Sequence, residues 1–198
     1  MSRAITVLPL DSPTLPPGLR EAAHALAADA RGTLGQEIQG AARRALFAPS
    51  LRPGHIIVAL LDGKIAGMAS FNFRGSGPVA PRLADFVNTL GVAGVWYWAL
   101  FNYVAMRKGR SGFYIVGIDA FDGFKRRGIG SALIGELCRI ARQYGAEAIE
   151  ADVRMDIAFV REFYRRLGSK PTRYRPFSIG WLITMTNGPY TRVSLSIT

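Results

Sequence analysis

The apolar and polar positions at the start of the chain predict one strand followed by two helices. A short β-type run covers residues 5–8, and apolar side chains then recur at helical spacing over residues 18–30 and over residues 36–47. Pro49 and Pro53 follow the second helix and end it, because proline cannot continue the helical hydrogen-bond ladder.

A β-hairpin follows these helices. Two runs rich in β-branched and apolar residues, 56–61 and 64–73, flank the dipeptide Asp62-Gly63. An Asp-Gly pair between two such runs favours a two-residue turn, because both positions tolerate a positive φ. We therefore expect the second and third strands to be antiparallel neighbours.

The segment 74–110 is unusually apolar and aromatic, above all over residues 83–106. A transmembrane helix needs about 20 predominantly apolar residues, and Asp85 and Asn88 leave a shorter clean run. We expect one or two helices inserted between strands three and four, with an apolar surface that covers a substrate pocket or a partner subunit in a homodimer. A peripheral membrane contact is the alternative, helped by the cations Arg107, Lys108 and Arg110.

The next stretch predicts a strand, a loop, a helix and a second strand. The first strand is expected over residues 112–120, and an amphipathic helix begins after Gly130 and ends at Gly145 in a left-handed cap. The second strand covers residues 148–153. The expected buried face of the helix is Leu133, Leu137, Ile140, Ala141 and Tyr144.

A shorter helix and a β-rich tail complete the pattern. Asp156 is expected to cap this helix, which ends at Gly168. Its expected buried side chains are Phe159, Val160, Phe163, Tyr164 and Leu167. β-like runs follow at residues 173–178, 181–186 and 193–197.

Composition narrows the class of protein. The chain has 198 residues, of which 49% are hydrophobic, and this fits one domain over residues 1–198 with a sizeable core. The single cysteine, Cys138, excludes an internal disulfide and is expected to be a buried structural thiol. Two histidines offer little for a metal site, so no metal is expected. The N-terminus lacks the apolar core of a signal peptide, so we expect a cytoplasmic protein.

The candidate chemistry centres on residues 125–131, Lys-Arg-Arg-Gly-Ile-Gly-Ser. Glycines at a helix start expose backbone N–H groups beside the positive end of the helix dipole, and three cations precede them. A balance of 25 Lys and Arg against 14 Asp and Glu, or +11, also favours anionic partners: a nucleotide cofactor, a nucleic acid or an anionic membrane. The stretch therefore predicts a phosphate or pyrophosphate site.

Two nucleotide-binding motifs fit this turn poorly. A P-loop needs Lys-Ser/Thr where Ile129-Gly130 stands, so the phosphate and magnesium contacts are missing. A Rossmann turn is matched by Gly128 and Gly130, and by Glu150 about 20 residues further on. However, Leu133 stands where glycine or alanine should allow close packing, and a polar loop separates the strand from the first glycine.

A third motif fits better. Lys125-x-x-Gly128-x-Gly130 resembles motif A of the GCN5-related N-acetyltransferase (GNAT) family, Arg/Gln-x-x-Gly-x-Gly/Ala, which binds the pyrophosphate of coenzyme A. Phe163-Tyr164 followed by Gly168 resembles the family's motif B at the usual separation, and the upstream order of elements also matches. The resemblance implies an α/β fold with a single mixed, mostly antiparallel GNAT-type sheet flanked by helices, here with a helical apolar insertion between strands three and four.

The resemblance also implies roles for individual residues. Acetyl-CoA is expected between splayed strands four and five, with its pantetheine arm and pyrophosphate bound by Ile118, Ala120, Lys125, Arg126, Arg127, Gly128, Ile129, Gly130 and Ser131. Tyr164 matches the tyrosine that protonates the departing thiolate, a general-acid role that suits a phenol with a pKa near 10.

Three positions depart from the family pattern. Lys125 keeps the charge of the usual arginine but loses its planar fork, and Ile157 stands where many members have asparagine. Tyr114 occupies the position of a base in several members, and it is expected to line the substrate site or position a water. The alternatives for the base are Asp119, Glu150 and Asp152, although alternation places Asp119 on the face opposite Tyr114. The general base is left open.

The function implied is transfer of an acetyl group from acetyl-CoA to a primary amine of a small molecule or peptide by direct attack. The basic residues of the segment 74–110 disfavour polycationic acceptors, and its aromatic residues favour an apolar or aromatic amine or a peptide N-terminus. The alternative is a non-catalytic acyl-CoA-binding or membrane-associated module with the same fold. Nucleic acid is not an expected partner, because much of the positive charge would serve a polyanionic cofactor.

Overall fold

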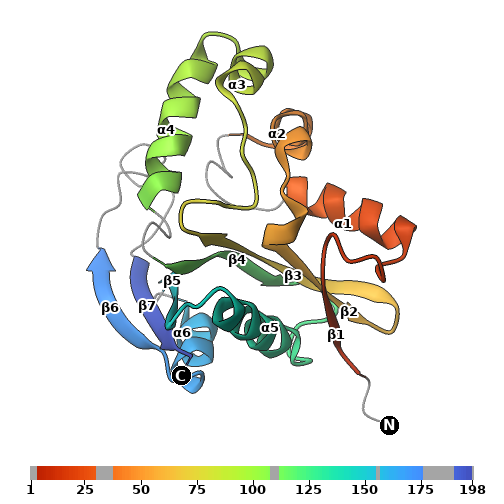
Figure 1. Ribbon diagram of the computed structural model, residues 1–198, viewed down its shortest axis with the longest axis vertical. Coiled ribbons are helices and arrows are strands. Elements are labelled where there is room, and N and C mark those ends of the chain that lie inside the picture. The colour runs from red at the N-terminus through yellow and green to blue at the C-terminus, as the bar shows by residue number, and fades with distance from the viewer. Residues whose placement is uncertain (1–3, 30–37, 108–111, 155–156, 176–189, 198) are drawn as a thin grey trace.

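A seven-stranded sheet in the order β1-β2-β3-β4-β5-β7-β6 forms the centre of the protein (Figure 1). The structure is a computed structural model that describes residues 4–29, 38–107, 112–154, 157–175 and 190–197. Among these residues only β4 and β5 are paired in parallel, so the predicted mixed, mostly antiparallel sheet is confirmed. The strands are β1 (Thr6–Pro9), β2 (Ile56–Leu61), β3 (Lys64–Phe73), β4 (Phe113–Ala120), β5 (Ala148–Arg154), β6 (Lys170–Arg175) and β7 (Tyr190–Ser196).

Helices cover both faces of this sheet. They are α1 (Pro17–Asp29), α2 (Gly40–Phe47), α3 (Leu83–Leu90), α4 (Ala93–Arg107), α5 (Ile129–Gln143) and α6 (Ala158–Arg166). Strand β2 is buried on both sides: Ile57, on one side, belongs to the core formed with α5. Val58 points to the other side, into the core formed with Ala23 of α1. Because successive strand residues face opposite ways, these two cores lie on opposite faces of the sheet.

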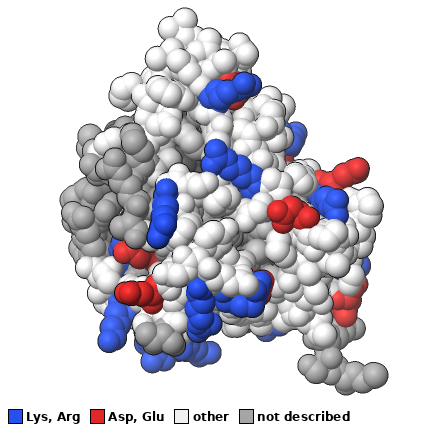
Figure 2. Space-filling view, in the orientation of Figure 1, with Lys and Arg blue, Asp and Glu red and all other residues white. Residues whose placement is uncertain are grey.

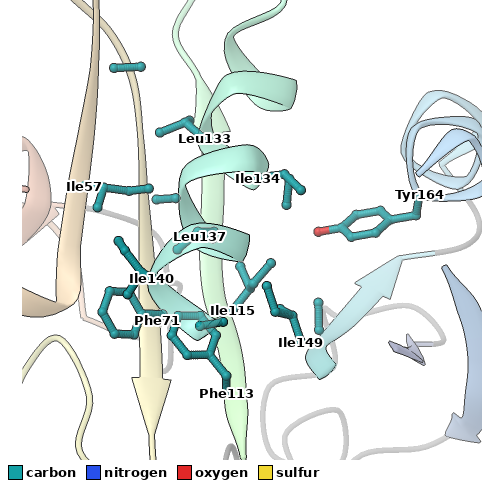
Figure 3. Packing of buried hydrophobic residues seen from close by; sticks show 14 of the residues in the cluster. Ile57, Phe71, Phe113, Ile115, Leu133, Ile134, Leu137, Ile140, Ile149 and Tyr164 are labelled. Carbon is teal, nitrogen blue, oxygen red and sulfur yellow. The ribbon is translucent and has the colours of Figure 1, made fainter. Parts of the chain in front are cut away.

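The core beneath α5 is the largest. Leu133 and Leu137 of α5 are fully buried in it, together with Phe71 and Phe113, whose stacked rings have centroids 4.6 Å apart (Figure 3). Burial of each such leucine stabilises the fold by roughly 1.5–3 kcal/mol. The predicted buried face of α5 is confirmed except at Tyr144, which is exposed at the helix end and packs its ring against Phe73.

The β2–β3 hairpin forms as predicted. Asp62 and Gly63 have φ values of 54° and 70°, and Leu61 pairs directly with Lys64. Two consecutive residues with positive φ make a tight turn whose twist matches that of the flanking strands.

Strand β4 contains one extra residue in its middle. Phe71 of β3 pairs with Ile115, whereas Ser70 pairs with Gly117, so Val116 is bulged out of the register. Pairing between β4 and β5 extends only from Phe113 to Ile115, although both strands continue beyond that point. A bulge bends its strand and increases its twist. The two strands therefore diverge after Ile115.

Two helices lie between β3 and β4, as the apolar segment predicted, and form a hairpin that projects at the top of Figure 1. Phe86 of α3 is fully buried beside Phe101 of α4, and Gly94 lets the helices touch, since a Cβ there would overlap the Phe86 carbonyl oxygen. At the tip, the side chains of Val92 and Trp96 are 90% and 62% exposed. Among the described residues no helix is both long enough and apolar enough to cross a membrane. That this tip meets a partner subunit or a membrane surface stays a prediction.

Some boundaries and one buried face differ from expectation. The N-cap of α6 is Ile157, not Asp156, which lies outside the described residues. Phe159 is 76% exposed instead of buried, because the apolar face of α6 borders an open cavity. Ile38 and Gln39 precede α2 instead of lying inside it, and β6 begins at Lys170. The β-like run at 181–186 lies outside the described residues.

Candidate active site

Two cavities meet along the second half of β4. The larger, of about 1100 Å³, lies between the diverging ends of β4 and β5 and is bordered by the start of α5 and by α6; we call it the seam cavity. The smaller, of about 440 Å³, lies on the opposite face of β3 and β4 and is bordered by α1, α2 and α4; we call it the helix-side cavity. Both are lined by Val116, Gly117, Ile118 and Asp119. This stretch of β4 therefore borders both cavities.

The glycine turn borders the seam cavity. Arg126 has a φ of 62°, and Gly128, with a φ of 84°, is the N-cap of α5. A side chain at Gly128 would be strained in this left-handed conformation, so the turn favours glycine there. The first N–H groups of α5 have no partner within the helix, and Ile129, Gly130 and Ser131 line the cavity. The turn thus presents backbone donors and the positive end of the helix dipole to the cavity.

The cations of the turn have different surroundings. Lys125 lines the seam cavity and donates a 2.6 Å hydrogen bond to Asp122, which raises the pKa of the lysine and lowers the pKa of the aspartate. Arg126 also lines the cavity. Arg127 does not, and its guanidinium instead lies 5.9 Å from the centre of the Phe124 ring. Eight of the nine residues predicted to bind acetyl-CoA therefore line one cavity.

Lys and Arg side chains gather over α5 and α6 in the view of Figure 2, and fewer acidic residues lie among them. One of the cations on α6, Arg166, lines the seam cavity while it donates to Glu162 at 2.7 Å. The two arginines that hydrogen-bond to Glu162 lower the pKa of that carboxyl to about 2. The surface around this cavity therefore favours an anionic ligand.

Tyr164 reaches the seam cavity from α6. Its side chain is 8% exposed, and its hydroxyl points away from α6 toward Ile134 of α5 (Figure 3). Burial raises the pKa of Tyr164 to about 12. The phenol is therefore protonated over the whole neutral range and can donate a hydrogen bond to a group in the cavity.

Tyr114 has a different environment. It is 2% exposed and is not among the described residues that line either cavity. Burial, followed by the charge and hydrogen bond of Asp152, raises the pKa of Tyr114 well above its ordinary value. Arg192 of β7 lies over the Tyr114 ring and donates to Asp152 at 2.8 Å and to Glu150 at 3.4 Å. Two of the candidate bases are therefore held by one arginine, although Asp152 also lines the seam cavity.

Asp119 is a carboxylate that lines both cavities. The alternation argument about its orientation is wrong, because the extra residue at Val116 reverses the parity of β4. Before the bulge Ile115 packs into the core under α5, and after it Ile118 and Ala120 do so. Asp119 therefore faces the same side as Tyr114, toward the helix-side cavity.

A model of the Acetyltransferase (GNAT) family matches residues 25–169, which is most of the chain. The chain belongs to this family. A sequence search of curated proteins finds no match. The motif A and motif B resemblance is therefore confirmed at the level of the family.

Solved structures agree with this GNAT assignment at the level of the fold. The chain is similar to a mutant of agmatine N-acetyltransferase, with a TM-score of 0.59 and 14% identity over 96% of this chain and 98% of that one. It is also similar to another acetyltransferase, with a TM-score of 0.56 and 18% identity over 90% and 96% of the two chains. The ribosomal-protein-S18-alanine N-acetyltransferase from Escherichia coli gives a TM-score of 0.51 and 16% identity over 98% and 95%.

Several residues of this GNAT site had no local signal in the sequence. Gly67 of β3 packs so closely that a Cβ there would lie 2.5 Å from the Asp119 carbonyl oxygen and 2.8 Å from Ile129. Arg192 lies far along the chain from the acidic groups that it binds. Arg43 is buried in the wall of the helix-side cavity, although it lies on a helix with a polar face. Each depends on contacts between distant segments.

Proposed function

We propose that the protein transfers an acetyl group from acetyl-CoA to a primary amine of a small molecule or peptide. The observation that supports this most is the meeting of two cavities at one stretch of β4. The seam cavity offers an anion site and a buried phenol, and the helix-side cavity opens onto the same residues from the other face. A donor and an acceptor bound on opposite faces would meet at Val116–Asp119.

The residues of the seam cavity fit coenzyme A. The backbone N–H groups of Ile129, Gly130 and Ser131 and the cations of the turn match a diphosphate. Beyond Ile115 the edge of β4 that faces β5 makes no strand pairing, so its backbone groups are available to the amides of a pantetheine arm. Ile118 and Ala120 lie on this edge. Acetyl-CoA supplies an activated thioester, and the chain's own groups bind and orient it.

Tyr164 would act where the thiolate departs. The amine attacks the thioester carbonyl, the C–N bond forms, the C–S bond breaks, and the proton lost by the amine is finally carried by the sulfur. A phenol of pKa about 12 is a weaker acid than a thiol of pKa about 8.5, so full proton transfer is uphill by about 3–4 units. Tyr164 therefore stabilises the developing thiolate mainly by donating a hydrogen bond.

The amine must be uncharged when it attacks. Asp119 lines both cavities and is the carboxylate best placed to bind the ammonium form and to accept its proton, directly or through a water. Glu150 and Asp152 are less suited, because Arg192 already neutralises them. Tyr114 would act indirectly, by fixing Asp152.

Thiol release from acetyl-CoA with a panel of amines tests the proposal. We expect Tyr164→Phe to lower kcat by about 10²-fold or more, the usual cost of removing one hydrogen-bond donor to developing negative charge, while the Kd for CoA changes little. Tyr144→Phe is the matched control, because Tyr144 is exposed at the other end of α5 and lines neither cavity. Tight CoA binding without turnover of any amine would favour the non-catalytic module instead.

A further inference from the structure

Phe159, in the first turn of α6, is a large apolar side chain that the described residues leave mostly uncovered. It lines the seam cavity and is 76% exposed. Burial of a phenylalanine stabilises a fold, and most of that stabilisation is missing here. The other apolar side chains of α6 differ, because Val160, Phe163 and Leu167 pack against the core under α5. The ring of Phe159 is therefore available to a ligand in the cavity.

The first turn of α6 lies at the open end of the seam cavity. Strands β4 and β5 are paired only up to Ile115 and Ala151, and they diverge beyond these residues. β5 ends at Arg154 and α6 begins at Ala158, so the first turn of the helix stays close to the diverged end of β5. Phe159 therefore lies away from the paired part of the strands.

Phe159 also lies close to the glycine turn. A Cβ added to Gly130 would be 3.4 Å from the ring of Phe163, so this ring packs against the start of α5. Phe159 precedes Phe163 by four residues, so the two side chains share a face of α6 and lie about 6 Å apart along the helix axis. The exposed ring is thus one helical turn from the backbone N–H groups that match a diphosphate.

Coenzyme A carries a group that fits this ring, provided that the proposed function holds. Its diphosphate joins the pantetheine arm on one side to an adenosine on the other. With the diphosphate at the glycine turn and the pantetheine arm along β4 toward Ile115, the adenosine extends the other way, toward the open end of the cavity. A purine is flat, and its faces stack on aromatic side chains.

The wall of the cavity separates apolar from charged groups in the same way. Ile157 and Val160 line the cavity beside Phe159, whereas Lys125 and Arg126 line it at the glycine turn. An apolar wall suits the face of a base, and a cationic one suits phosphates. We infer that the adenine ring of coenzyme A stacks on Phe159, so that the first turn of α6 binds the nucleoside while the glycine turn binds the diphosphate.

Two ligands that differ in the nucleoside test this inference: CoA, and 4′-phosphopantetheine, which lacks the adenosine. In calorimetric titrations we expect Phe159→Ala to raise the Kd for CoA about 5- to 150-fold, the range for loss of one stacked base. The Kd for 4′-phosphopantetheine should stay within about twofold. Phe159→Leu should lose nearly as much affinity for CoA, because leucine is apolar but not flat, and Phe159→Trp should bind CoA at least as tightly as the wild type.

Trp96→Ala is the matched control. Trp96 is also an exposed aromatic residue, at 62%, but it lines neither cavity, so its removal should change neither Kd. Phe159→Ala should unfold at the wild-type temperature, because the side chain that it removes is exposed. A loss of affinity for CoA in this variant is then a property of the site and not of the fold.

The outcomes separate this inference from the proposed function. If CoA binds but no amine is acetylated, the proposed function fails and the titrations still decide the inference. If amines are acetylated but Phe159→Ala binds CoA as tightly as the wild type, the inference fails and the proposed function stands. An equal loss of affinity for both ligands also overturns it, because the ring then acts on the phosphopantetheine portion. No binding of CoA to the wild type would overturn both.

Discussion

The substitution Gly67→Ala should both destabilise the fold and disturb the seam cavity. Gly67 pairs with Ala120 at the end of β4, and a Cβ there would lie 2.5 Å from the carbonyl oxygen of Asp119 and 2.8 Å from the side chain of Ile129. Real Cβ atoms do not approach so closely, so the backbone of β4 or the start of α5 must move. Overpacking of this kind costs about 1–3 kcal/mol. In a chain of this length each kcal/mol lowers Tm by roughly 2–4 °C.

The same displacement should lower the affinity of the seam cavity for CoA. Ile129 is the first residue of α5 and is 1% exposed, so pushing it away shifts the N–H groups that line the seam cavity. Loss of one such hydrogen bond should raise the Kd for CoA at least about threefold.

Thermal unfolding and calorimetric titration with CoA measure both effects of Gly67→Ala. Gly117→Ala, on the facing strand, is the matched control for thermal unfolding, because the nearest atom to its Cβ would be the Ser70 hydroxyl at an ordinary 3.8 Å. The control should stay within about 0.5 kcal/mol of the wild type. If Gly67→Ala unfolds at the wild-type temperature and binds CoA equally well, the packing argument is refuted.

Three further predictions concern the turn, the helix that follows it and the buried phenol. Asp122→Asn should tighten CoA binding, because Lys125 loses its 2.6 Å partner, and titrations at rising salt should show the gain shrinking. Gly135→Ala should raise the free energy of unfolding by up to about 1 kcal/mol in urea titrations, since a Cβ in this exposed part of α5 meets nothing within 4 Å. The pKa of Tyr164 is raised to about 12, so the ratio of wild-type to Tyr164→Phe rates should stay constant between about pH 7 and pH 10. Above that range the unfolded tyrosine ionises first, and the free energy of unfolding should fall with rising pH less steeply in Tyr164→Phe than in the wild type.

The parts of the fold that could be predicted are those determined by neighbours in the sequence. The hairpin followed from Asp62-Gly63, because the turn needs two residues with positive φ and nothing distant. The buried face of α5 followed from its helical spacing, because one side of that helix lies on the sheet. The anion site followed from Gly128 and Gly130 for the same reason, since a helix start presents its N–H groups whatever lies around it.

The parts that could not be predicted depend on cavities and on contacts between segments that are far apart in the sequence. Phe159 belongs to an apolar helical face, and spacing alone does not distinguish a core from the wall of a cavity. Arg43 is buried on α2, which packs against a distant helical hairpin, and packing of this kind cannot be read from the spacing within α2. The orientation of Asp119 was mistaken because a bulge at Val116 has no clear sequence signature and reverses every later position of its strand.

That bulge also bears on the order in which the substrates of the proposed reaction bind. A sheet is ordinarily a barrier, and molecules bound on its two faces do not meet. Around Val116, however, two cavities border the same stretch of β4, the seam cavity on one side and the helix-side cavity on the other. Each partner would have its own entrance, so neither has to leave before the other arrives. Such an arrangement favours a ternary complex over a relay through an acylated enzyme.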